Sequence, residues 1–569
     1  MAEADPIPGD CRGMNFFESD AGLRQLLPHY LAPKALRHFL PHFARMGALA
    51  GSAIDELAAI ADRNPPVLHA RDRLGHDEDW IEYHPAYRDL ERIAFEAFEL
   101  PVMSHRPGVL GWPETVPPVA KYVFQYLFVQ AEFGLMCPVS LTDTSIHLIR
   151  AHAEGETRDH LLGRLLADDP ARRWKAAQFI TEKTGGSDIG AVETVARSDG
   201  STWRIEGDKW FCSHADADVA LLLARPEGAA AGTAGLGLFA LPRRRKDGTR
   251  NAYRILRLKD KLGTRSMASG EIRLEGAEAY PIGPLDRGFK AMLEQVNLSR
   301  LSHGVRAAAM MRRCLNEALA AANGRRAFGR RVADFPLMRR QLLKLMVPAE
   351  QALSMVLFAA AAMGEGRRDL LRVLTPLIKF RACRDNIAVA TGAMEARGGN
   401  GYIEEWVTAR LVRDAQIGVL WEGTSNIIAL DLVGRAVGRE GAHRALAQRL
   451  SEQLGGAGLP PAYRRRLGGA LDRAFSLAED VARDPGAEAE VRHAASALYH
   501  AVSAVLLAAE GARDPADARR ALLSRFVLEH RLAPRDPLAR AEAAWEAKAG
   551  ELLLAGRPVA LAEAAALLS

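Results

Sequence analysis

One carboxylate of this sequence stands among apolar and small residues, where it could act as a base. It is Glu422, in the segment Leu420-Trp421-Glu422-Gly423-Thr424-Ser425-Asn426. Burial away from a cation would raise the pKa of such a carboxyl group and suit it to proton abstraction. The polar residues that follow could instead cap a helix, and a carboxylate near a helix N-terminus is often only structural. Spacing alone leaves both interpretations open.

A polar turn with two glycines follows a short apolar run, in Phe179-Ile180-Thr181-Glu182-Lys183-Thr184-Gly185-Gly186-Ser187-Asp188. Glycine lets the backbone approach a ligand closely, and exposed N–H groups can bind an anion or a carbonyl oxygen. Thr181 and Ser187 could add hydroxyl contacts. Because Gly-Gly-Ser-Asp is also a common surface turn, the turn alone does not establish a ligand site.

Two further segments could hold a planar or a phosphate-bearing ligand. Lys209-Trp210-Phe211-Cys212-Ser213 has aromatic residues at successive strand positions, so one ring could face the core and the other a flat ring system. Core packing alone is the simpler interpretation. Asn323-Gly324-Arg325-Arg326-Ala327-Phe328-Gly329-Arg330 sets arginines beside a helix end. These arginines could grip phosphates bidentately, or form only a basic surface.

The elements that must position these segments change in kind along the chain. Residues 1 to about 168 favour helices, with apolar stripes over 119–134 and 145–164. Short strands, separated by turns at Asp199-Gly200 and Asp247-Gly248, indicate a β-barrel or sandwich; they are predicted at 176–181, 202–207, 209–213, 219–224 and 235–241. Helices return at 289–322, 336–364, 370–396, near 426 and beyond 440, with loops at 455–461 and near 514–515.

The composition is that of an ordinary globular protein with more than one domain: 569 residues, 48% hydrophobic and 25% charged. No apolar run reaches the roughly 18 residues that span a bilayer, so no membrane association is expected. Residues 1–10 are acidic and Pro-rich, unlike a signal peptide, which predicts a cytoplasmic protein. The five cysteines form no C-x-x-C pair and the histidines no H-E-x-x-H pair, so neither a disulfide framework nor a metal is expected.

Charge is unevenly distributed. Residues 241–350 hold 24 Lys and Arg against 10 Asp and Glu, whereas residues 431–569 hold 19 against 18. A basic middle can attract a nucleotide cofactor, another phosphate-bearing ligand or a nucleic-acid backbone, although it could equally be a solvated surface with acidic partners elsewhere.

Together and in this order, the segments resemble the acyl-CoA dehydrogenase superfamily over residues 60 to 430. The motifs that carry the resemblance are Thr181-Glu182 with Gly186-Ser187-Asp188, Gly207-x-Lys209-Trp210, Lys261-Leu262-Gly263-x-Arg265-Ser266, Arg325-x-x-Phe328-Gly329, Gly398-Gly399-x-Gly401-Tyr402 and Glu422-Gly423-Thr424-Ser425. Within it, the sequence is most similar to the AidB-like alkylation-response branch. The markers are Asn64-Pro65-Pro66, His84-Pro85-Ala86, Met136-Cys137-Pro138, Thr181-Glu182-Lys183 before Gly185-Gly186, Leu258-Lys259-Asp260-Lys261-Leu262-Gly263, Trp421-Glu422-Gly423 and the long helical stretch after 440.

The resemblance implies an α+β fold of the acyl-CoA dehydrogenase type. Its parts would be an N-terminal helical domain (1–168), a middle β-barrel domain (169–283), a C-terminal helical bundle (284–440) and an extra helical extension (441–569). It also implies FAD, lying between barrel and bundle, and a homotetramer built as a dimer of dimers. The order of helices, strands and helices inferred from the residues agrees.

The resemblance also assigns roles to single residues. Thr181 should contact the flavin ring system, Ser187 the pyrophosphate, and Arg325 and Phe328 the FAD of a neighbouring subunit. The complete implied FAD-binding set is Gln178, Thr181, Gly186, Ser187, Trp210, Phe211, Ser213, Arg325, Phe328, Gly399, Gly423, Thr424 and Asn426.

The implied reaction is α,β-dehydrogenation of an acyl-CoA thioester. Glu422 would remove the α-proton, and a hydride would leave the β-carbon for the flavin. The thioester oxygen would accept hydrogen bonds from the Glu422 backbone N–H and a ribityl hydroxyl. Some branches carry the base just before an arginine that matches Arg300. Ser299 stands at that position and cannot serve, which favours Glu422 and leaves Arg300 to order the site wall.

The sequence departs from the common family pattern at two places that the AidB-like branch shares. Lys183-Thr184-Gly185-Gly186 replaces Pro-Gly-Ala-Gly, and Glu395 replaces a glutamine that contacts FAD. The branch implies weak dehydrogenase activity and duplex DNA binding through the C-terminal helical region. The alternative function is therefore a DNA-binding alkylation-response flavoprotein, which the basic middle and Arg464-Arg465-Arg466 also favour. A non-catalytic scaffold is a third, minor option.

Overall fold

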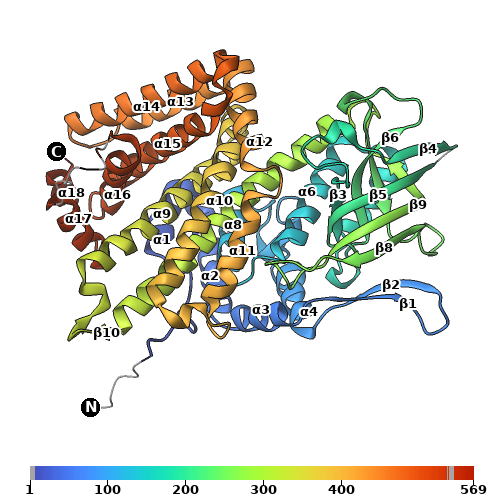
Figure 1. The fold of residues 1–569 in the computed structure, drawn as a ribbon, viewed down its shortest axis with the longest axis horizontal. Helices are drawn as coiled ribbons and strands as arrows, with labels where there is room; N and C mark the ends of the chain where they lie inside the picture. Colours follow the sequence, from blue (N-terminus) through green and yellow to red (C-terminus); the bar gives the residue numbers. More distant parts are fainter. Residues whose placement is uncertain (1–6, 201, 535, 537, 539–543, 569) are drawn as a thin grey trace. The chain divides into compact units, whose positions relative to one another are not determined.

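The computed structural model describes residues 7–200, 202–534, 536, 538 and 544–568 (Figure 1), so most of the predicted acidic start lies outside the described residues. The chain forms two compact units. Unit 1 comprises Met1–Gly51, Pro118–Gln130 and His303–Ser569, and unit 2 comprises Ser52–Pro117 and Ala131–Ser302. The predicted domain boundaries at 168, 283 and 440 divide the chain differently and stay predictions.

A closed seven-stranded sheet forms the β part of unit 2. Its strands are β3 (Ala176–Phe179), β4 (Val195–Asp199), β5 (Thr202–Ser213), β6 (Val219–Pro226), β7 (Gly237–Pro242), β8 (Tyr253–Leu258) and β9 (Ser269–Pro281). Pairing runs from β5 through β4, β6, β7 and β9 back to β5, so the sheet closes on itself. The predicted β-barrel is confirmed.

The sequence predicts two strands, over 202–207 and 209–213, where the structure has the single strand β5. It is one strand whose pairing with β9 becomes irregular after Ile205 and again after Lys209. Between these points Gly207 has φ +143°, and a Cβ there would lie 2.9 Å from the Thr194 Cα, so only glycine fits. Strands β4, β8 and β9 were not predicted. In β9, charged residues interrupt the apolar pattern.

The N-terminal part of unit 2 is helical except for one hairpin. Its helices are α3 (Ala53–Arg63), α4 (Pro85–Glu91), α6 (Met136–His152) and α7 (Gly155–Leu165), and its hairpin is β1 (Val67–Arg71) with β2 (Asp77–Glu82). The hairpin, which the helical prediction missed, is held beside β8 because buried Asp79 pairs with Arg250 and accepts the Ile255 N–H at 3.0 Å. The predicted helix over 145–164 is wrong as a single element, since Gly155 takes φ +54° at the break between α6 and α7.

The described part of unit 1 is helical apart from one hairpin of two-residue strands. Its helices are α1 (Ala21–Tyr30), α2 (Pro33–Ala50), α5 (Pro118–Val129), α8 (Gly288–Gly324, whose start belongs to unit 2), α9 (Pro336–Gly364), α10 (Arg368–Arg397), α11 (Val407–Ala415), α12 (Ser425–Leu430), α13 (His443–Gly455), α14 (Pro461–Arg483), α15 (Val491–Arg513), α16 (Arg519–Val527), α17 (Ala544–Leu554) and α18 (Leu561–Ala566). The predicted long helices α8 to α10 are confirmed, and so are the predicted loops before α14 and after α15. Helix α5 ends earlier than predicted.

A buried network of charges joins distant parts of unit 1. Arg312 of α8 lies 3.1 Å from Asp20 and also pairs with Glu350 of α9. Arg520 of α16 reaches Glu350 at 2.5 Å and Glu510 of α15 at 2.9 Å. All five side chains are buried. Burial opposes ionisation of Glu350, but the two guanidinium groups lower its pKa to about 2. The C-terminal helices are therefore fixed to the bundle by compensated charges.

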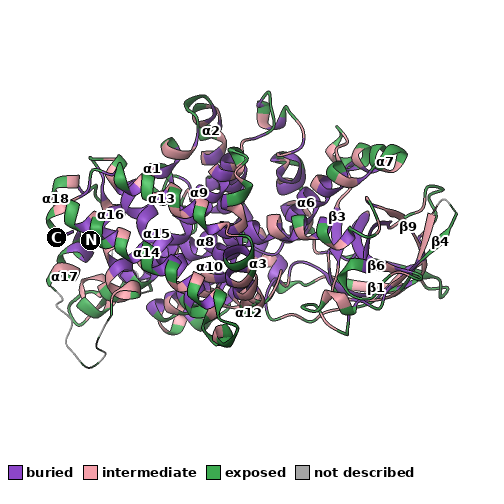
Figure 2. Cartoon of the chain, turned by 90° about the horizontal axis from the view of Figure 1, so that it is seen from above, coloured by how far each residue is buried: buried purple, intermediate pink, exposed green. Residues whose placement is uncertain are grey.

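Two helical segments of unit 1, Pro336–Gly364 and Pro485–Arg513, are long and apolar enough to cross a membrane. The expectation that no segment would be so apolar is therefore corrected. In each, 89% of the apolar window is buried inside the protein. Figure 2 shows this burial along α9 and α15. Core helices of soluble proteins meet the same length and composition criteria, so these features are weak evidence for a membrane.

Candidate functional site

Glu422 lies in a strained turn just before α12. Its φ is +55°, and Gly423 follows at φ +102°. A non-glycine residue in this region costs of order 1–3 kcal/mol, so the surrounding structure must impose it. Buried Lys379 of α10 does so, because its Nζ donates to the carbonyl oxygens of Gly418 at 2.6 Å and Gly423 at 3.2 Å. The half-buried carboxylate is thus presented by a turn that a lysine holds on both sides.

The residue before Glu422 packs on buried polar side chains. The Trp421 ring lies 5.4 Å from the His303 ring, tilted by 61°, and 6.0 Å from the Arg306 guanidinium. Burial, reinforced by the positive charges of Arg306 and Lys379, holds the pKa of His303 well below its ordinary value. His303 is therefore neutral at physiological pH and lies beside the turn as an uncharged aromatic ring.

The polar residues after Glu422 make contacts that the capping prediction did not include. Thr424 occupies the N-cap position of α12, but its hydroxyl makes no capping hydrogen bond among the described residues. Ser425 Oγ accepts a bond from Arg384 at 3.3 Å, and Asn426 Oδ1 accepts one from Arg492 at 3.2 Å. Thr424 and Asn426 are exposed, as a ligand-binding role requires.

Arg325, Phe328 and Gly399 are brought together around a small hairpin of unit 1. Its strands are β10 (Arg326–Ala327) and β11 (Arg330–Arg331), with Phe328 at the tip, φ +51° and 95% exposed. Gly398, directly before Gly399, takes φ +78°, which favours glycine, and a Cβ there would lie 3.1 Å from Arg325 Nη1. The Phe328 ring lies 6.2 Å from the Phe335 ring, so the exposed tip packs mainly on its own segment.

In unit 2, the turn formed by residues 181–187 (the 181–187 turn) lies against β5. The Trp210 N–H donates to the Thr181 carbonyl at 2.8 Å. A Cβ on Gly186 would lie 3.1 Å from both branches of the Thr181 side chain, so the turn folds back on Thr181. Ser187 and Gly186 are exposed, whereas Gln178 is buried with its amide nitrogen 2.9 Å from Met292 Sδ. The structure therefore brings Thr181, Gly186 and Trp210 together.

A buried ion pair fastens the 181–187 turn, although we did not predict it as part of the site. Lys209 Nζ lies 2.6 Å from Glu182 Oε1 and donates to the Leu223 carbonyl at 2.8 Å. The same carboxylate accepts bonds from the backbone N–H of Glu193 and from Thr194. Burial opposes the charge on Glu182, but Lys209 and these bonds lower its pKa. Both residues stand in the family motifs, which is the signal that identifies them.

The aromatic pair does not pack in the core. Trp210 is half-buried and Phe211 is 57% exposed, so the core-packing interpretation fails. Lys259, which sequence reasoning missed as a site residue, lies with its Nζ 3.2 Å from the Trp210 ring centroid and 4.9 Å from that of Phe211. One amine reaches both rings because β5 is irregular between Lys209 and Cys212, so strict alternation fails. Ser213 pairs with Gln178 at the end of this strand.

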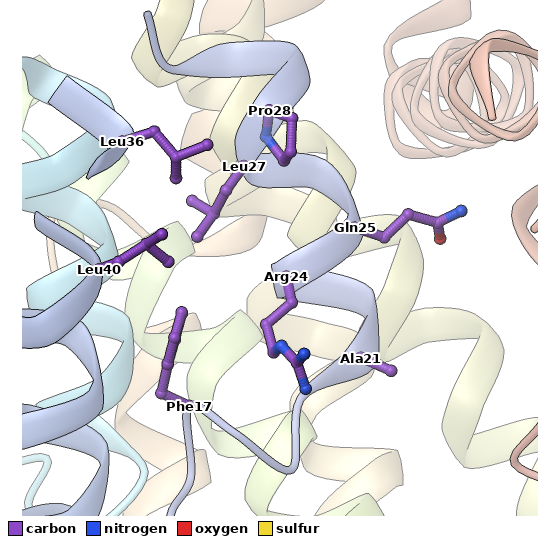
Figure 3. A pocket seen from close by; sticks show the side chains of 8 residues that line it. All are labelled: Phe17, Ala21, Arg24, Gln25, Leu27, Pro28, Leu36 and Leu40. Atoms are coloured by element: carbon purple, nitrogen blue, oxygen red, sulfur yellow. The ribbon is translucent and has the colours of Figure 1, made fainter. Parts of the chain in front are cut away.

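Two hollows lie away from all the predicted site residues. One, of about 400 Å³, lies between α1 and α2 (Figure 3) and is lined by Phe17, Ala21, Arg24, Gln25, Leu27, Pro28, Leu36 and Leu40. The other, of about 540 Å³, lies on α7 and is lined mainly by charged residues. Among the described residues, no group of three or more His, Cys, Asp or Glu side chains is placed to hold a metal ion.

Family models match three consecutive parts of the chain. The adaptive response protein AidB N-terminal domain matches residues 7–169, the acyl-CoA dehydrogenase middle domain residues 177–277, and the acyl-CoA dehydrogenase C-terminal domain residues 286–438. These parts contain every predicted site residue. The chain belongs to the acyl-CoA dehydrogenase family, and its N-terminal part is of the AidB type. The predicted family, branch and fold are confirmed.

Individual relatives agree with this assignment. The chain is 31% identical to acyl-CoA dehydrogenase family member 11 of Caenorhabditis elegans over 77% of this chain and 72% of the relative. It is 32% identical to the putative acyl-CoA dehydrogenase AidB of Escherichia coli, over 72% and 77%. The structure of Caenorhabditis elegans ACDH-11 in complex with C11-CoA matches with a TM-score of 0.85 and 25% identity, covering 93% of each chain. That coverage includes most of the helices after residue 438.

Proposed function

We propose that the protein is an FAD-dependent acyl-CoA dehydrogenase in which Glu422 is the catalytic base. The observation that carries the proposal is the geometry of this residue. Its half-buried carboxylate stands on a left-handed turn that Lys379 holds from both sides, within a segment that matches the family's C-terminal domain. A structural cap would need neither the strain nor the buried lysine.

The residues present in unit 2 fit a flavin. Beside the 181–187 turn, the half-buried indole of Trp210 and the exposed phenyl ring of Phe211 offer apolar faces to a flat ring system. Gly186 and Ser187 leave backbone and hydroxyl groups accessible for phosphate oxygens. Bound FAD would supply the acceptor for the hydride equivalent from the substrate β-carbon.

The chain's own groups would carry out the proton chemistry. Glu422 would take the α-proton of an acyl-CoA thioester, and its backbone N–H would donate to the thioester oxygen as negative charge develops there. Next to the turn lie neutral His303 and the Trp421 ring, neither of which would offer a second acidic group beside Glu422. Ser299 offers no second carboxylate at the position used by other branches.

Anaerobic titration with a panel of acyl-CoA thioesters tests the proposal. We expect the flavin absorbance to bleach with at least one thioester, and Glu422→Gln to lose this reaction while still binding FAD. Absence of bleaching with every thioester, or full activity of Glu422→Gln, would refute the proposed function.

We also propose a homotetramer, because Phe328 is 95% exposed at the tip of a hairpin next to Arg325. A large apolar side chain held in solvent at a strained φ favours burial against another subunit. The molar mass in solution tests this. A cytoplasmic location stays a prediction, to be checked by cell fractionation.

A second candidate function is duplex DNA binding in an alkylation response. It is supported by the match to the AidB N-terminal domain and by two exposed basic residues on the hairpin, Arg326 and Arg330. Arg331 beside them pairs with Asp334 at 2.9 Å. The Arg464-Arg465-Arg466 run supports it less, since Arg466 pairs with Glu529 at 2.7 Å. Retardation of duplex DNA at increasing salt tests it. Phosphate-driven binding must weaken steeply as salt rises, and a flat response would exclude it.

A further inference from the structure

Two arginines from different helices converge on the segment that follows Glu422. Arg384 belongs to α10 and donates to Ser425 Oγ at 3.3 Å. Arg492 belongs to α15 in the C-terminal extension and donates to Asn426 Oδ1 at 3.2 Å. Both acceptors are neutral, so these hydrogen bonds orient the guanidinium groups without cancelling their charge.

The charge of this pair is compensated only weakly within the described part of the chain, since Asp385 raises the pKa of Arg384 less than burial and the neighbouring arginines lower it. Neither Arg384 nor Arg492 forms an ion pair there, and neighbouring Asp385 has both oxygens bound to Arg381, at 2.7 and 3.1 Å. Burial, and then the charges of Arg492 and Arg381, lower the pKa of Arg384. By contrast, two buried arginines of unit 1, Arg312 and Arg520, each touch two carboxylates.

The pair is open to a ligand. Arg492 and Asn426 are exposed, and Arg384 and Ser425 are half-buried. Guanidinium groups form short bidentate hydrogen bonds with phosphate oxygens, and two of them from separate helices can hold one phosphate from two directions. Hydroxyl and amide groups such as those of Ser425 and Asn426 add weaker bonds.

We propose that Arg384 and Arg492 bind a phosphate group of a nucleotide-bearing ligand, so that the C-terminal extension takes part in ligand binding. The inference rests on the proposed function, since both ligands of that reaction carry such groups. The phosphate comes either from FAD or from the 3′-phosphate of coenzyme A. The site lies next to the Glu422 turn in the chain, which suits either source.

The test uses Arg384→Gln, Arg492→Gln and the double variant of the full chain. Arg473→Gln, an exposed arginine of α14, is the matched control. FAD affinity is measured by fluorescence titration after flavin removal. Affinity of the holoenzyme is measured for an acyl-CoA and for the same thioester without the 3′-phosphate. We expect the double Arg→Gln variant to weaken the affinity for one of the two ligands about tenfold or more. Arg→Lys variants should retain only part of that affinity, since an ammonium group cannot bind a phosphate bidentately.

The outcomes separate the sources. Weaker FAD binding assigns the phosphate to the flavin. Weaker acyl-CoA binding with unchanged binding of the dephosphorylated thioester assigns it to coenzyme A. If the affinities for FAD and for acyl-CoA both change by less than about twofold, the inference is overturned. The same holds if the variants lose only affinity for duplex DNA. Both affinity measurements report binding alone, so a wild-type protein that binds these ligands without bleaching would refute the proposed function and leave this inference standing.

Discussion

Lys209 Nζ lies 2.6 Å from Glu182 Oε1, and both side chains are almost completely buried. The pair joins the start of the 181–187 turn to strand β5, one residue before Trp210. It therefore fixes the backbone that we propose to face the flavin. A buried ion pair of this kind resists the loss of one partner, because the remaining charge stays in a medium of low polarity.

Replacing Lys209 with Met should lower the free energy of unfolding by about 3–5 kcal/mol and weaken flavin retention. Glu182→Gln added to this variant should restore part of the stability, since no unpaired charge then remains. Urea denaturation measures the first effect and the flavin absorbance of the purified protein the second. Lys290→Met, at an exposed lysine of unit 2 outside the turn, is the control. Equal stability of Lys209→Met and wild type would contradict this account.

Replacing Lys379 with Met should release the Glu422 turn without touching the carboxylate. We expect kcat to fall about 10²-fold, because a displacement near 1 Å at a reacting group has that effect. Proton abstraction would become slower, so the isotope effect with α-deuterated substrate should increase. Lys379→Arg should recover part of the rate. A loss explained wholly by reduced folding, with an unchanged isotope effect, would show that Lys379 is only structural.

The stability of unit 1 should depend on the ionisation of Glu350. Its pKa is lowered to about 2 from an ordinary value of 4.5, so its stabilisation is complete above about pH 5 and is lost as the pH falls toward 2. The shift corresponds to roughly 3 kcal/mol. Glu350→Gln should therefore be much less stable than wild type at pH 6, and the difference should shrink at pH 3. Urea unfolding at both pH values tests this, with exposed Glu365→Gln as the control.

Replacing Phe328 with Ser should weaken the proposed tetramer and leave the subunit folded, because the side chain is 95% exposed. Loss of a buried phenyl ring costs about 1.5–3 kcal/mol at each contact, enough to shift assembly more than tenfold. Light scattering gives the molar mass. Leu74→Ser, at an apolar residue that is 69% exposed, is the control. An unchanged mass at micromolar concentration would remove Phe328 from the interface.

The parts of the fold that follow from local patterns could be predicted. Helix α9 begins and ends as expected, because a proline starts it and a glycine ends a long apolar run. Strand β6 was also recognised, because its residues 219–224 form a continuous buried apolar run. Strand β9 and the β1–β2 hairpin were missed, since their charged residues are satisfied by partners far along the chain. Asp79, which pairs with Arg250, is an example.

In the candidate site, too, some residues could be predicted from the sequence and others could not. Glu422, Thr181 and Trp210 stand out through motif and composition, and the structure brings the last two together. Lys379 lies more than 40 residues before the turn that it holds, and Lys259 comes from a segment with no aromatic pattern of its own. A single sequence does not reveal which lysine meets which carbonyl or ring, because long-range packing decides it.

The buried charges around Arg520 also limit how the protein can be shortened. A chain cut after the last family-matched segment would lose Arg520 and Glu510 together, and would leave Glu350 with only one of its two guanidinium partners. The apolar face of α9 that α15 and α16 cover would also become exposed. Such a fragment should precipitate or unfold rather than act as a minimal enzyme. The terminal helices are thus a structural requirement of the bundle, and comparisons of activity should use the undivided polypeptide.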